Sequence, residues 1–156
     1  MYRLNIGKEK AWQKIKHYCA YQERSHKEVK EKLYGFGLYK ADVEMLLTQL
    51  IEENYLNEER FALAFAGGKF RMKQWGRQKI KYELKQKQVS DYCIKKALAA
   101  IDGEQYEKVL YKMATGKLNA LKTEKNLLLK KRKLQQYLMQ KGFETAIITK
   151  VIDELF

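Results

Sequence analysis

Two stretches of the chain concentrate basic side chains. Residues 69–87 carry eight Lys or Arg against one acid, Glu83, and residues 117–133 carry seven against one, Glu124. Ammonium and guanidinium groups bind phosphates, and an exposed tyrosine such as Tyr82 can stack on a base. The two stretches therefore predict contact with a polyanion, either a nucleic acid or an acidic protein surface.

The net charge of the whole chain points the same way. Its 156 residues include 32 Lys and Arg and 19 Asp and Glu, so the formal charge is +13. Residues 1–57 contribute +2, residues 58–106 contribute +5 and residues 107–156 contribute +6. The last two thirds of the chain are therefore expected to bind the partner.

Residue patterns typical of catalysis or metal binding are absent from the sequence. Phosphate-binding glycine loops, HExxH and GxSxG do not occur. His17, Cys19 and His26 lie close in sequence, but a metal site would need further ligands, and Cys19 falls on an apolar stripe. We therefore expect a protein that is not an enzyme and uses no metal and no cofactor.

The sequence also favours a cytoplasmic protein without a membrane segment. No apolar run approaches the roughly 18 residues that span a bilayer, and the N-terminus lacks the apolar core of a signal peptide. The two cysteines, Cys19 and Cys93, form no CxxC pattern, which fits a reducing compartment.

An internal repeat indicates the fold. Proline is absent, and apolar residues recur at spacings of three and four, which predicts an all-α protein. Six apolar columns match in three copies: Val29, Ile80, Leu134; Leu33, Leu84, Leu138; Leu38, Val89, Phe143; Val43, Ile94, Ile148; Leu47, Leu98, Ile152; Leu50, Ile101, Leu155. We expect three-helix repeats at 1–56, 57–103 and 104–156, packed as an elongated, curved tandem array in a monomer.

Helical geometry separates the inner from the outer residues of each copy. With Ile80 and Leu84 inward, the turn of about 100° per residue places Tyr82 and Lys85 on the opposite face. The alternative to a binding surface is an ordinary lysine-rich helix face that contacts only water. The predicted binding residues are Arg24, Lys27, Lys73, Arg77, Lys79, Lys81, Tyr82, Lys85, Lys130, Arg132 and Lys133.

Three segments resemble the linked signatures of a known family. "ERSHKEVKEKL" at 23–33, "NYLNEERFALAF" at 54–65 and "WGRQKIKYELKQKQV" at 75–89 are similar, in order and spacing, to motifs of the RecX regulatory proteins. The resemblance extends over about residues 10–100. Val29 stands where leucine is usual, Asn57 where aspartate is common, and Gln88 where the family has glycine, a change that can alter the local turn.

The resemblance implies tandem three-helix repeats and a role in DNA repair and recombination, within the SOS response. Members of the family bind the RecA filament on DNA, usually limiting its ATPase and strand-exchange activities, and they can bind DNA. For this chain the resemblance implies a non-catalytic RecA modulator. Its affinity for bare single- and double-stranded DNA should be weak and salt-dependent.

Two other functions fit the composition. A Myb-like or helix-turn-helix array would read duplex sequence with the third helix of each repeat. Those segments, at 42–51, 91–100 and 144–156, are poor in the Arg, Asn and Gln that read bases. A scaffold for an acidic protein is the third possibility, and it predicts no binding to nucleic acid even at low salt.

Overall fold

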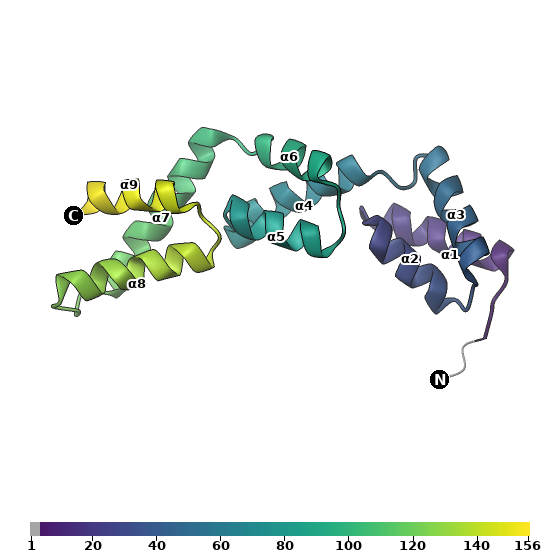
Figure 1. The fold of residues 1–156 in the computed structure, drawn as a ribbon, viewed down its shortest axis with the longest axis horizontal. Coiled ribbons are helices and arrows are strands. Elements are labelled where there is room, and N and C mark those ends of the chain that lie inside the picture. The colour runs from purple at the N-terminus through teal and green to yellow at the C-terminus, as the bar shows by residue number, and fades with distance from the viewer. Residues whose placement is uncertain (1–3) are drawn as a thin grey trace. The chain divides into compact units, whose positions relative to one another are not determined.

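The computed structural model describes residues 4–156, and within that range it contains nine α-helices and no strand (Figure 1). In chain order the helices are α1 Lys8–Tyr21, α2 His26–Gly35, α3 Lys40–Glu52, α4 Glu58–Lys73, α5 Arg77–Gln86, α6 Asp91–Ala99, α7 Gly103–Ala120, α8 Leu127–Gln140 and α9 Thr145–Leu155. The all-α fold built from three-helix repeats is confirmed. The elongated, curved shape stays a prediction.

Side-chain caps explain where several helices begin. Ser25 accepts a hydrogen bond from the Glu28 amide at 3.1 Å, and Asn57 accepts one from the Arg60 amide at 2.8 Å. Asp102 does the same for the Gln105 amide at 3.1 Å. Each cap satisfies an amide that has no partner inside its helix, so each fixes the first turn of α2, α4 or α7.

The apolar columns form the interior. The first two columns, which lie on the second helix of each repeat, are completely buried: Val29, Leu33, Ile80, Leu84, Leu134 and Leu138. In α1–α3 they pack with Ala11, Ile15 and Leu50, and the rings of Trp12 and Tyr55 meet edge to face at 6.2 Å. Leu98 and Leu155, in the last two columns, are only half-buried.

The turn between the second and third helices has the same backbone conformation in all three repeats. Gly37, Gln88 and Gly142 occupy equivalent positions and adopt φ of 86°, 61° and 96°. Only glycine enters this left-handed region without steric cost. The sequence left open whether Gln88 alters this turn. The structure shows that the turn is preserved and that Gln88 adopts a strained backbone conformation.

The described residues fall into two compact units. Of the described residues, one unit comprises 4–65 with 84–96, and the other comprises 66–83 with 97–156. The limits between them lie inside α4, α5 and α6, so the middle set of helices contributes to both units. The repeat limits at 1–56, 57–103 and 104–156 stay a prediction.

Within the first unit, the start of α2 docks against the turn that follows α5. The Lys27 ammonium donates to the Gln86 carbonyl at 3.2 Å, and Glu28 pairs with Lys87 at 3.3 Å. Glu58, at the start of α4, accepts a hydrogen bond from the Ser90 amide. This junction is made largely by charged side chains.

Within the second unit, the equivalent junction is made by backbone groups. The Gly76 amide donates to the Lys141 carbonyl at 2.7 Å, and the Gln78 amide donates to the Gly142 carbonyl at 2.8 Å. A Cβ atom on Gly76 would lie 2.5 Å from the Phe143 nitrogen. The glycine at position 76 is therefore required by the close approach of two backbones.

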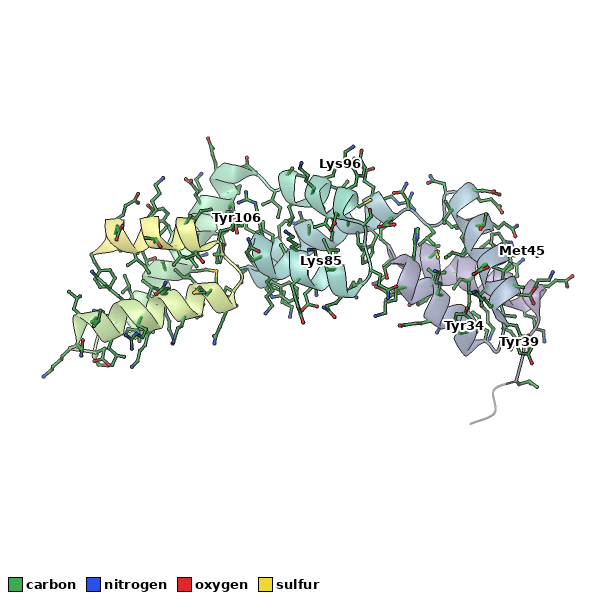
Figure 2. All side chains as sticks on the ribbon, in the orientation of Figure 1. Tyr34, Tyr39, Met45, Lys85, Lys96 and Tyr106 are labelled. Carbon is green, nitrogen blue, oxygen red and sulfur yellow. The ribbon has the colours of Figure 1, made fainter. Side chains whose placement is uncertain are left out.

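A buried tyrosine completes this second junction. The hydroxyl of Tyr106, on α7 (Figure 2), donates to Glu144 and accepts from the Arg77 amide at 2.9 Å. Burial, followed by the hydrogen bond to Glu144, raises the pKa of Tyr106 well above its usual range. The Arg77 guanidinium stacks on the ring at 3.8 Å and pairs with Glu144 at 3.0 Å. These contacts tie α5, α7 and the start of α9 together.

Replacing Gln88 with glycine should stabilise the protein, because it removes a left-handed side-chain conformation. We expect the free energy of unfolding to rise by about 0.5–1 kcal/mol, the strain relief being partly offset by the greater entropy of glycine in the unfolded chain. Urea unfolding followed by circular dichroism measures the change. Gln86→Gly, within α5, is the control and should lower stability by a similar amount. Equal effects of the two substitutions would contradict a strained Gln88.

The Arg77–Glu144 ion pair should contribute measurably to stability, since both side chains are less than one third exposed. In a double-mutant cycle with Arg77→Met and Glu144→Gln, each single change should destabilise the protein, and the coupling energy should be about 1–2 kcal/mol. Chemical unfolding of the four proteins measures it. Additive effects, without coupling, would show that the pair does not hold the junction.

Candidate binding surface

Three of the predicted binding residues are engaged inside the protein. Arg24 lies 3.7 Å above the Tyr18 ring, donates to the Tyr18 carbonyl at 3.0 Å, and its side chain is only 13% exposed. Lys27 and Arg77 belong to the two junctions. These three cations stabilise the fold, and we therefore do not include them in the exposed binding surface.

Tyr82 and Lys85 lie on the outer face of α5, as the helical projection predicts, and Lys81 lies nearer the flank. Lys81, Tyr82 and Lys85 are exposed, with 61% of the Tyr82 surface accessible, while Ile80 and Leu84 are completely buried. Lys85 is marked on this helix in Figure 2. Two cations and an aromatic ring thus lie within two turns of one helix, an arrangement suited to phosphates and stacked bases.

A tryptophan that the sequence analysis did not single out borders this face. Trp75, directly before α5, lies 4.7 Å from the Lys79 ammonium and 5.1 Å from the Lys69 ammonium. Lys79 is therefore half-buried against a ring, while Lys73, near the end of α4, is exposed. The interleaving of Trp75 with basic residues in "KQWGRQK" is the signal in the sequence.

The second predicted cluster lies on the first turns of α8. Lys130 and Lys131 are half-exposed and Arg132 is exposed. Lys133 pairs with Glu124 at 3.2 Å, and the Asn126 amide with this ammonium lowers the pKa of the Glu124 carboxyl. The cluster is separate from the junction with α5, because Lys131 and Lys141 are about 15 Å apart along the helix.

Three exposed leucines precede this cluster, and the apolar columns did not predict them. Leu127, Leu128 and Leu129 are 57%, 69% and 36% exposed. Their signal in the sequence is a run of three adjacent apolar residues immediately before "KKRK", which breaks the spacing of three and four.

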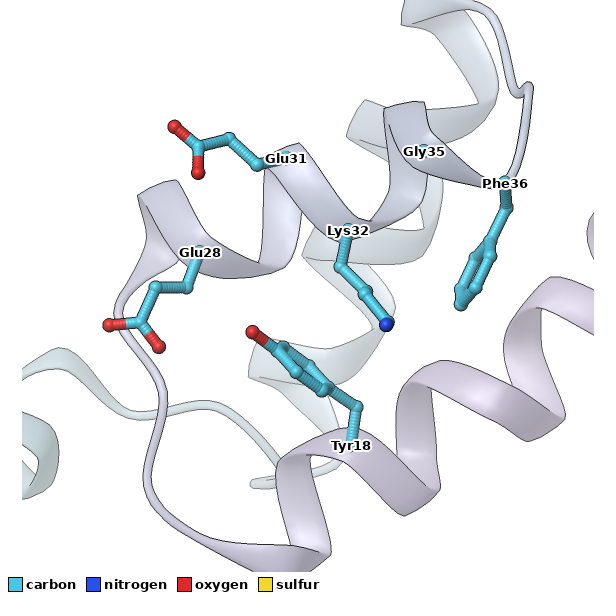
Figure 3. A pocket seen from close by; sticks show the side chains of 6 residues that line it. All are labelled: Tyr18, Glu28, Glu31, Lys32, Gly35 and Phe36. Carbon is cyan, nitrogen blue, oxygen red and sulfur yellow. The ribbon is translucent and has the colours of Figure 1, made fainter. Parts of the chain in front are cut away.

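A depression between α1 and α2 is explained by local packing (Figure 3). It is lined by Tyr18, Glu28, Glu31, Lys32, Gly35 and Phe36. The Lys32 ammonium lies 5.3 Å from the Tyr18 ring and 5.7 Å from the Phe36 ring. Glu28 is committed to Lys87 in the junction. Two of the charged groups of the depression, Glu28 and Lys32, are therefore engaged by neighbours in the same unit.

The candidate metal residues do not come together in the structure. Across residues 4–156 no group of three His, Cys, Asp or Glu side chains is placed to hold a metal ion. Burial raises the pKa of the Cys19 thiol to about 11. Burial also lowers the pKa of His26, which lies 3.8 Å from Glu58. Over the same described part, none of the helices is both long and apolar enough to cross a bilayer.

Family models match two consecutive parts of the chain. Residues 57–98 match the second three-helix domain of RecX, and residues 104–152 match the third. The third set of helices, which lies beyond the resemblance at about 10–100, is thereby included.

Similar proteins agree with these matches. The chain is 30% identical over 138 residues to the regulatory protein RecX of Prosthecochloris aestuarii, covering 88% of each chain. It is 31% identical over 133 residues to the RecX of Clostridium perfringens, covering 85% of this chain and 62% of the relative, so it spans about three fifths of that longer protein.

A solved structure shares the fold. The crystal structure of RecX from Lactobacillus salivarius superposes with a TM-score of 0.86 at 24% identity, covering 95% of this chain and 96% of the other. The all-helical repeats, the matches to two consecutive domains and the identity with full-length relatives together show that the chain belongs to the RecX family of regulatory proteins.

Proposed function

We propose that this chain regulates the RecA recombinase by binding the RecA filament on DNA and limiting its ATPase and strand-exchange activities. Membership of the RecX family carries the proposal, and the curated relatives are named regulatory proteins. It would act as a cytoplasmic monomer in DNA repair and recombination, with no cofactor of its own.

The outer face of α5 supports a contact with the DNA of the filament. Lys81 and Lys85 are four residues apart and so lie on one side of the helix, with Tyr82 between them. Ammonium groups attract phosphates over a distance that shortens as the salt concentration rises. A tyrosine ring contributes the most stacking energy where a base is already unstacked from its neighbours. Such a face favours stretched or single-stranded DNA over any particular sequence.

The chemistry of the junction acids supports a role in binding rather than catalysis. Glu28 and Glu144 pair with Lys87 and Arg77, and Glu58 accepts from a backbone amide. Carboxylates held in this way stabilise the fold and are not paired for acid–base transfer. The protein would therefore act by occupying the filament.

ATP hydrolysis by the cognate RecA on single-stranded DNA tests the proposal. The wild-type protein should lower the rate, and Lys81→Glu with Lys85→Glu should require about tenfold more protein for the same effect, because it places two negative charges beside phosphates. The same variant should lower the salt slope for binding to a bare oligonucleotide by about 1.4, the value for two lost contacts to a single strand.

The control reverses two exposed lysines elsewhere, Lys10→Glu on α1 with Lys150→Glu on α9, and makes the same change in net charge. It should behave like the wild type in both assays. A wild-type protein that leaves the ATPase rate unchanged at stoichiometric levels would rule out the proposed function.

A further inference from the structure

The second turn of α8 holds the position that forms a repeat junction elsewhere in the chain, and α8 extends one turn further toward its N-terminus than α2 and α5 do. By the repeat register, Lys131 corresponds to Arg77 at the start of α5 and to His26 at the start of α2. In both of those places the helix start docks against a turn between two helices, at 86–90 or at 141–144. Within residues 4–156 the third of these faces remains open.

The open face is apolar and basic. A groove of about 320 Å³ between α8 and α9 is lined by Leu128, Lys131, Arg132, Gln135, Thr149, Ile152 and Asp153. Leu127 and Leu128 are more than half exposed beside it. Among the described residues no carboxylate forms an ion pair with Lys130, Lys131 or Arg132, although Asp153 lines the groove. The Lys131 ammonium lies 5.2 Å from the Phe156 ring, a contact that leaves it able to accept a carboxylate partner.

We propose that this face, residues 127–132 with the groove toward α9, binds an acidic helix–turn segment of a partner protein that carries an apolar side chain. The internal junctions define the chemistry of such a partner. Arg77 pairs with the carboxylate of Glu144, the residue directly before α9, so the equivalent Lys131 and its neighbours are suited to carboxylates. Leu127 and Leu128 add an apolar contact that is gained only when they leave water.

A nucleic acid fits this face less well than a protein does. Phosphates would pair with Lys130 and Arg132, but three leucines offer neither stacking nor hydrogen bonds to a base. The α5 face, in contrast, combines lysines with an aromatic ring and has no exposed aliphatic neighbour between residues 77 and 87. The two basic clusters therefore address different partners, DNA at α5 and protein at α8.

A second copy of the chain also fits less well. The matching turn of the first repeat, at Gly37, is already covered by its own N-terminal segment, where the Ile6 amide donates to the Phe36 carbonyl at 3.1 Å. A Cβ on Gly37 would lie 2.6 Å from the Leu4 carbonyl oxygen. That turn is therefore unavailable to the α8 face of another molecule.

A designed peptide tests the inference without the recombinase. The probe is a fluorescent helical peptide of about 18 residues, or five turns, with leucines on one face and glutamates on the other, and its partner probe has serines in place of the leucines. The wild-type protein should bind the leucine peptide about tenfold more tightly than the serine peptide. Leu127→Ser with Leu128→Ser should remove that preference, whereas Leu63→Ser with Met72→Ser, two exposed apolar residues on α4, should retain it.

Parallel assays separate the other partners. The Leu127→Ser, Leu128→Ser protein should bind a single-stranded oligonucleotide as the wild type does. A loss of oligonucleotide binding, a leucine-dependent binding to phosphatidylglycerol vesicles in place of the peptide, or a leucine-dependent self-association in sedimentation would each overturn the inference. Equal affinity for the two peptides would do so as well.

If the proposed function holds, the α8 face contacts the RecA protein of the filament and the α5 face contacts its DNA. This part of the inference rests on the proposed function. The leucine variant should need about tenfold more protein to inhibit ATP hydrolysis, with its DNA affinity intact. If the wild type does not inhibit, the proposed function fails while the peptide assay still decides the inference. If the wild type inhibits and the leucine variant inhibits equally, the assignment to the filament is wrong.

Discussion

The close approach of two backbones at Gly76 and Gly142 is the constraint on which the second unit depends. A three-helix repeat of about 50 residues has too little interior to be stable alone, so its apolar ends must be covered by a neighbour. Here the start of α5 packs directly on the turn between α8 and α9, and two backbone hydrogen bonds of 2.7 and 2.8 Å join them. Any side chain at position 76 would separate the two elements and expose the ring of Phe143 beneath them.

This docking divides the basic stretch "GRQKIKYEL" between two roles. Gly76 and Arg77 lie in the junction, where the guanidinium is stacked on Tyr106 and paired with Glu144. Ile80 and Leu84 are core residues, whereas Gln78, Lys81 and Tyr82 are exposed, as is Lys85 directly after the stretch. A reversal of charge at Arg77 would repel Glu144, and the resulting loss of stability would be mistaken for a loss of binding.

The two junctions use the same positions with different chemistry. The first relies on the Glu28–Lys87 ion pair, which salt weakens, and on the hydrogen bond from Lys27 to the Gln86 carbonyl. The second combines the Arg77–Glu144 ion pair with amide-to-carbonyl bonds, which salt affects little. A regulator built in this way keeps α5 and the turn before α9 in a fixed register. Its two basic surfaces differ in character, since α5 carries an aromatic ring and α8 carries aliphatic side chains.

Periodicity in the sequence was sufficient to predict the helices, the six apolar columns and the outward position of Tyr82 and Lys85, because helical geometry relates spacing directly to burial. It also indicated the family, through motifs that lie mostly at junctions and caps. Periodicity did not reveal that Arg24, Lys27 and Arg77 are internal, since an arginine on a helix flank has the same spacing whether it meets water or Glu144. For Arg77 that choice was made by Glu144, 67 positions away in the chain and brought near only when one repeat docked on the next. Arg24 is instead engaged by Tyr18, six positions away.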